Sequence, residues 1–112
     1  MKIIKTPLTK SEIAGLKAQQ GSYLKLTIDL EKEIGVAGCI LHADGEAILL
    51  REGSQQRNIW GGGIDLESRT IDTTAILNLR PNLDNNSLDI IDGEKRQSFI
   101  NIIKKLFEQL WL

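Results

Sequence analysis

The residues with the most versatile side chains lie between positions 42 and 80. His42, Asp44 and Glu46 alternate along the chain, and Asn78 and Arg80 alternate in the same way further on. If both segments are strands, each set lies on one face of a sheet, where cross-strand neighbours are about 5 Å apart. A histidine, two carboxylates and an arginine could bind a divalent ion or perform acid–base chemistry on an anionic substrate. The simpler alternative, which we favour, is an ordinary solvated sheet face.

Residues 42–50 are also compatible with a helix, which would give these groups a different geometry. In a helix, His42 and Glu46 would lie one turn apart, close enough to share a metal ion. Two ligands do not make a site, however, and the sequence has no second histidine. Gly45 would fall in the first turn of such a helix, and Asp44-Gly45 is a strong hairpin-turn signal. We therefore favour a strand or hairpin here and keep the helix as the alternative.

Other motifs point to structure rather than to chemistry. The three glycines at 61–63 could let a backbone approach a phosphate, but they lack the spacing of a P-loop or of a dinucleotide-binding turn. A bulge or tight bend after Trp60 is the better interpretation. Ser54 and Ser87 have no nucleophile-elbow motif around them, and Cys39 lies between apolar neighbours as a core residue would.

The elements that would position these residues follow from capping signals and periodicity. Thr9 and Glu12 have the spacing of a capping box, which predicts a helix to about Gln20 that ends at Gly21. Residues 23–31 alternate as a strand with one dry and one wet face does. The dry face would hold Leu24, Leu26, Ile28 and Leu30, and the wet face Lys25, Thr27, Asp29 and Glu31.

The rest of the chain predicts further strands and one long helix. After a turn at 33–35, strands are expected at 36–41, at 57–60 with a resumption at 64–66, and at 71–79. Asp92 should cap a helix that runs to about Leu110. The expected fold is α+β, an antiparallel sheet of about four to five strands. The N-terminal and the long C-terminal helix would pack on one face of it.

The C-terminal helix carries a wider apolar band than one surface helix needs. Ile100, Phe107 and Trp111 extend the main stripe sideways and could pack on a second copy of the chain. Equally, both stripes could pack on the sheet of the same chain.

Length and composition bound the class of protein. The 112 residues predict a single domain, 1–112, and the single cysteine cannot form an internal disulfide. With 14 basic and 15 acidic residues, the charge gives little support for nucleic-acid binding. Residues 1–7 lack the apolar stretch of a signal peptide and no run is long enough to span a membrane, so we expect a soluble cytoplasmic protein. No cofactor is expected.

Several short runs together resemble a small prokaryotic family of stand-alone domains of unknown function. The resemblance rests mainly on residues 42–47, Glu52-Gly53-Ser54, Trp60-Gly61 and residues 78–81. It implies no catalytic role. It directs attention to six residues as one candidate ligand-binding site, namely His42, Asp44, Glu46, Trp60, Asn78 and Arg80.

Two functions from different classes follow. The favoured one is a non-enzymatic binding or interaction domain that self-associates as a homodimer through the C-terminal helix or a sheet edge, with any small-molecule ligand unidentified. The alternative is a small metal-dependent or acid–base hydrolase. In that enzyme His42 would be base or ligand, Asp44 and Glu46 ligands, and Arg80 the clamp for an anion.

Overall fold

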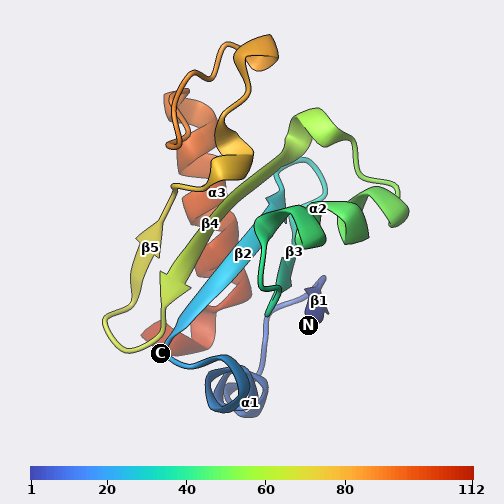
Figure 1. Ribbon diagram of the computed structural model, residues 1–112. Coiled ribbons are helices and arrows are strands. Elements are labelled where there is room, and N and C mark those ends of the chain that lie inside the picture. The colour runs from blue at the N-terminus through green and yellow to red at the C-terminus, as the bar shows by residue number, and fades with distance from the viewer.

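The computed structural model describes residues 1–112 as a five-stranded antiparallel sheet with three α-helices (Figure 1). The order of strands across the sheet is β1-β3-β2-β4-β5, so β1 and β5 form its edges. The predicted α+β class is confirmed. None of the helices is long and apolar enough to cross a membrane. The elements are β1 (Lys2–Ile4), α1 (Lys10–Gln20), β2 (Tyr23–Asp29), β3 (Ile34–Ala37), α2 (His42–Arg51), β4 (Ile59–Asp65), β5 (Thr70–Asp72) and α3 (Gly93–Leu106).

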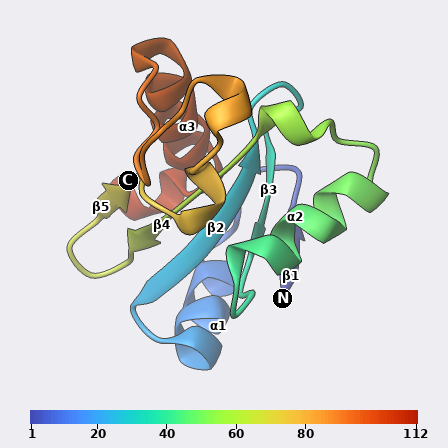
Figure 2. The same cartoon turned by 45° about the horizontal axis from the view of Figure 1, so that its top comes forward.

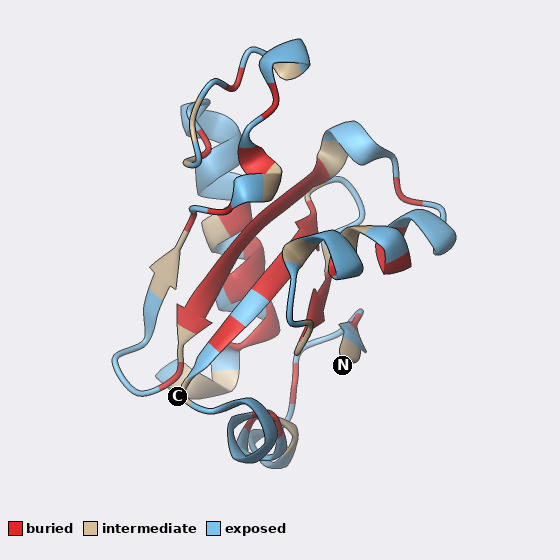
Figure 3. Cartoon of the chain, in the orientation of Figure 1, coloured by how far each residue is buried: buried red, intermediate tan, exposed pale blue.

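One face of the sheet is covered by α1 and α3, as predicted, and it holds the larger core. The alternation in β2 places Leu24, Leu26 and Ile28 inside, where they pack with residues of both helices. Figure 3 shows buried segments on either side of an exposed one along this strand. The capping box of Thr9 and Glu12 is present at the start of α1. Asp92 caps α3 by accepting a hydrogen bond from the backbone N–H of Lys95.

The other face is covered by α2, and here the strand or hairpin interpretation of residues 42–50 is wrong. These residues form a regular helix, whose Ile48 and Leu49 pack against Val36 and Ile59 of the sheet. Gly45, which argued against a helix, is what lets the helix lie on the sheet. A β-carbon at position 45 would be 2.5 Å from the Thr27 hydroxyl. Figure 2 shows α2 and α3 on opposite sides of the sheet.

Because α2 covers this face, the prediction that one face of β2 lies in solvent is also wrong. Thr27 and Asp29 were expected in solvent, but both are buried. The Thr27 hydroxyl donates to the carbonyl of His42, 3.2 Å away. The Asp29 carboxylate accepts hydrogen bonds from the backbone N–H groups of Glu31 and Lys32, in the turn that follows the strand.

The glycines at 61–63 form no bulge or bend, contrary to our prediction. β4 runs through them, paired with β2 from Ile59 to Asp65 without interruption. A β-carbon at Gly61 would lie 3.0 Å from the His42 ring, and one at Gly62 would lie 2.8 Å from the Phe99 ring. The glycines therefore let covering side chains approach the sheet closely on both faces.

Three element boundaries also differ from the predictions. β3 begins in the expected turn, at Ile34, and ends at Ala37 before Gly38, which has a φ of 87°. β5 stops at Asp72, whose carboxylate accepts the N–H and the hydroxyl of Thr74 and so turns the chain. The expected remainder of that strand holds a short 3-10 helix, η2 (Ile76–Asn78). α3 ends at Leu106, and another 3-10 helix, η4 (Glu108–Trp111), follows it.

Candidate functional site

The six predicted site residues separate into a polar network and a surface hollow. Glu46, Trp60 and Arg80 meet in the network, and Asn78 lies in the same region of the chain, on η2. His42 lies at the start of α2 and lines the hollow. Asp44, in the first turn of α2, is exposed and forms no ion pair. The structure therefore does not assemble the six residues into one site.

Arg80 is held by partners within the protein. One guanidinium nitrogen donates to the backbone carbonyls of Gln56 and Ile59, at 2.9 and 2.6 Å, and another forms a 2.8 Å ion pair with Glu46. The guanidinium also lies 5.3 Å from the centre of the Trp60 ring, within cation–π range. Burial lowers the pKa of Arg80, and the Glu46 carboxylate opposes that shift. These contacts join α2 to the segment after η2.

Asn78 is fully buried and acts as an extra pairing partner for β4. Its side-chain oxygen accepts the Gly61 N–H at 2.8 Å, and its amide nitrogen donates to the Gly61 carbonyl at 2.9 Å. The same nitrogen donates to the carbonyls of Thr73 and Leu88. The side chain is thus occupied by backbone partners, which gives Asn78 a structural role, and its role in ligand binding stays a prediction.

Asn85, which was absent from the predicted site, has the same role in the neighbouring loop. Its amide nitrogen donates to the carbonyls of Asn78, Ser87 and Asp89, and its oxygen accepts the Ile91 N–H. The only signal in the sequence was the concentration of Asn and Asp between positions 82 and 87, which indicates a loop and no more.

The ring of His42 packs against the glycine segment of β4. Its Nε2 lies 2.7 Å from the carbonyl oxygen of Gly62. Because a carbonyl can only accept, Nε2 carries the proton of this hydrogen bond. Burial lowers the pKa of His42, more than the bond to Gly62 and the charge of Asp72 raise it. The ring is therefore a neutral donor to the sheet at pH 7.

Side chains that could coordinate a metal ion do not lie together anywhere in the chain. No group of three or more His, Cys, Asp or Glu side chains is arranged to hold a metal. Glu46 binds Arg80 and the Nε2 of His42 binds a carbonyl, so neither matches the role that a hydrolase would give it. His42 and Glu46 lie on one helix, but they do not form one chemical site.

A surface hollow of about 430 Å³ lies between the start of α2 and η2. Its lining is mainly apolar, which is typical of surfaces that bind a partner. Ile76 is 81% exposed beside it, and Ile40, which precedes Leu41 in the chain, is 82% exposed. Sequence reasoning missed this region, since residues 76–77 looked like strand interior. The hollow is lined by Lys25, Leu41, His42, Ala43, Ala75, Ile76 and Leu77.

The predicted apolar band of the C-terminal segment does not form one exposed stripe. Phe107 is fully buried in the core of its own chain, and Ile100 is half-buried. Trp111 is 39% exposed and lies in η4, beyond the end of α3. Of the three residues, only Trp111 offers substantial surface to another molecule.

Comparison with known proteins gives a family and no function. Residues 2–106 match the model of a family described as "Protein of unknown function (DUF5674)". This match confirms the resemblance to a family of unknown function. No curated protein and no solved structure matches the chain.

Proposed function

We propose that this chain, which belongs to the DUF5674 family of proteins of unknown function, is a non-catalytic interaction domain that associates with a second copy of itself. The contact would be the α2–η2 surface, defined as Ile40, Leu41, Ala43, Ile76 and Leu77 around the hollow. The observation that carries the proposal is the exposure of large aliphatic side chains beside an apolar depression.

The polar groups at the α2–η2 surface support a binding role without catalysis. Lys25 donates to the carbonyl of Ile40, and His42 donates to that of Gly62. These internal bonds anchor the two side chains, so the remaining surface is dominated by aliphatic carbon. A partner with an aliphatic surface would complement it better than a charged substrate would.

The shape of the α2–η2 surface favours a second copy as the partner. A hollow with a protruding aliphatic side chain at its side provides both halves of a contact that a two-fold axis can repeat. Ile76 of each chain could then enter the hollow of the other. Burial of such a side chain stabilises association by about 1.5–3 kcal/mol for each copy.

Light scattering after gel filtration tests this association. At about 100 µM the wild-type chain should elute with twice the 12.5 kDa mass of one copy, since mass action favours a dimer at that concentration. Ile76→Asp should elute as a monomer, because dimerisation would bury an unpaired carboxylate. Leu88→Asp, at an exposed leucine outside the hollow, is the matched control and should remain dimeric.

Two outcomes would contradict the proposal. A wild-type monomer at this concentration would exclude self-association, and a dimer that survives Ile76→Asp would exclude the α2–η2 surface.

The predicted contact through Ile100, Phe107 and Trp111 is tested by Trp111→Asp, which we expect to leave the dimer intact. The hydrolase alternative has no comparable support, because Glu46 and Arg80 are paired with each other. Residence in the cytoplasm and a prokaryotic source stay predictions.

A further inference from the structure

The edge strand β1 has backbone groups without a pairing strand, and it lies at the edge of the sheet away from the hollow of the α2–η2 surface. β1 pairs with β3 from Lys2 opposite Ala37 to Ile4 opposite Gly35, and no strand lies on its other side. In an antiparallel ladder only alternate residues direct their N–H and C=O groups to the partner. The remaining groups of β1 therefore point outward, where an extended chain could pair with them.

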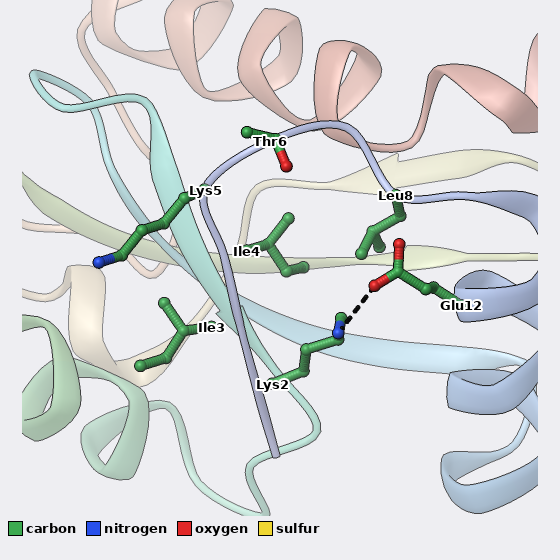
Figure 4. A pocket seen from close by; sticks show the side chains of 7 residues that line it. All are labelled: Lys2, Ile3, Ile4, Lys5, Thr6, Leu8 and Glu12. Atoms are coloured by element: carbon green, nitrogen blue, oxygen red, sulfur yellow. Dashed lines mark ion pairs between the residues drawn. The ribbon is translucent and has the colours of Figure 1, made fainter.

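A hollow accompanies this edge on each face of the sheet. On the α1 side, a hollow of about 440 Å³ is lined by residues 2–6 together with Leu8 and Glu12 (Figure 4). On the α2 side, a hollow of about 550 Å³ is lined by residues 1–3 together with Ile48 and Arg51. Successive side chains of an added strand point to opposite faces, so they would enter these two hollows in turn.

The side chains of β1 give the two hollows different chemistry. Lys2 points to α1, where it forms a 2.9 Å ion pair with Glu12, and Ile4 is buried in the core on that side. Ile3, which is 39% exposed, and Lys5 point to α2 (Figure 4). In the α1-side hollow Glu12 is thus paired with Lys2, and Lys5 is the one further charged residue of the lining, with aliphatic carbon from Ile4 and Leu8 beside it.

The α2 side carries an excess of positive charge. Lys5 forms a 2.8 Å ion pair with Glu52, while Arg51 forms no ion pair. The residues that line this hollow include two cations, Lys2 and Arg51, and no anion, so a carboxylate that enters it would meet an excess of positive charge. A second copy of the chain paired through β1 would instead bring another Lys5 and Arg51 to the same place, and edge lysines of this kind oppose pairing between like strands.

From this arrangement we propose that the free edge of β1 is a strand-addition site for an extended acidic segment of a partner protein. The backbone of that segment would continue the sheet beyond β1. Aliphatic side chains would alternate toward Ile4 and Leu8, and carboxylates would alternate toward Lys5 and Arg51. This is recognition of a peptide by β-augmentation, with the charge of one hollow selecting the sequence.

Fluorescence polarisation with two labelled heptapeptides tests the site. The probe alternates valine and glutamate, and its counterpart alternates valine and lysine. The acidic peptide should bind at least about tenfold more tightly than the basic one, because its charges complement the α2 side. A version of the acidic peptide with methylated backbone nitrogens should lose binding, since it cannot pair with β1. Equal binding of the acidic and basic peptides, or no loss on methylation, overturns the proposal.

Charge exchange on the protein gives the sharper test. The double variant Lys5→Glu, Arg51→Glu should bind the acidic peptide about tenfold more weakly and should now prefer the basic one. The matched control, Lys10→Glu with Lys104→Glu, reverses two exposed charges elsewhere and should leave both affinities within about twofold. An unchanged preference in the first variant overturns the proposal.

The binding site can be mapped on the Ile76→Asp variant, so that the result does not depend on self-association through α2–η2. In amide NMR spectra the acidic peptide should shift residues 2–5 and 35–37. Shifts confined to the residues around Ile76, or the formation of dimers joined through β1 without added peptide, would overturn the proposal. Failure of the dimer at the α2–η2 surface leaves this outcome unaffected.

Discussion

On one face of the sheet, α1 and α3 rest on a continuous layer of aliphatic and aromatic side chains. On the other face, α2 and η2 approach the strands so closely that glycine is needed beneath them. Phe99 and Ile103 represent the first kind of contact, since both are fully buried in the larger core. Gly45 and Gly61 represent the second, because a β-carbon at either would contact a covering or underlying residue within 3 Å.

The two faces therefore depend on different forces. The side of the sheet covered by α1 and α3, the α1–α3 face, is stabilised mainly by the burial of apolar area, which is insensitive to the direction of each contact. The opposite side, covered by α2 and η2, is the α2–η2 face. The α2–η2 face has a smaller core of Val36, Ile48, Leu49 and Ile59, and it relies on directed hydrogen bonds from Asn78, Arg80 and His42. Replacing a single polar residue on the face covered by α2 and η2 should consequently lower the free energy of unfolding by more than the small change in side-chain size suggests.

Replacing Asn78 should give the largest effect and would confirm the polar character of this face. Asn78→Ala leaves the N–H and carbonyl of Gly61, and the carbonyls of Thr73 and Leu88, without their side-chain partner. We expect the free energy of unfolding to fall by about 3 kcal/mol or more, as measured by urea denaturation. Asn86→Ala, at an exposed asparagine in the same loop, should change it by less than about 0.5 kcal/mol. Similar values for the two variants would remove the distinction between the faces.

A pair of glycine substitutions compares the two faces directly. Gly15 in α1 has open space around it, whereas Gly45 in α2 lies against Thr27. Gly15→Ala should raise the free energy of unfolding by up to about 1 kcal/mol through helix propensity. Gly45→Ala should lower it by about 1–3 kcal/mol, because the added methyl pushes α2 away from β2. Thermal denaturation of both variants measures the difference, and stabilisation by both would show that α2 is not tightly packed.

The same contrast explains how far the sequence could predict the fold. The α1–α3 face was predictable because its signals are local, namely the capping box at Thr9, the cap at Asp92 and the alternation of Leu24, Leu26 and Ile28. The α2 helix was not predictable in this way. Gly45 weakens the local preference for a helix, and its benefit depends on Thr27, which is distant in the sequence.

The candidate site shows the limit more clearly. Sequence reasoning chose Asn78 and Arg80 for their side-chain chemistry, and both prove to be engaged with backbone carbonyls of other segments. A polar residue in a loop looks the same in sequence whether its partner is a ligand or a buried peptide group. Conversely, Ile76 lay within an expected strand, and only the early end of β5 at Asp72 leaves it exposed.

The smallest expected effect concerns pH, and it isolates the contact between His42 and the sheet. Burial lowers the pKa of His42, with Lys25 lowering it further and Gly62 and Asp72 opposing the shift. The unfolded chain therefore takes up a proton at a higher pH than the folded chain does. The stability from neutral His42 is complete above the unfolded pKa of about 6.5, and it declines as the pH falls from there toward the lower folded pKa.

This decline should be visible in urea denaturation between pH 7.5 and 5, because His42 is the only histidine and the carboxylates with lowered pKa values titrate below this range. His42→Gln should abolish the decline across this window, while the wild-type chain becomes modestly less stable toward pH 5. Gln56→Ala, at an exposed glutamine, should retain the wild-type slope. If His42→Gln keeps that slope as well, the ring is not held neutral against Gly62, and the α2–η2 face depends on hydrogen bonding less than its geometry indicates.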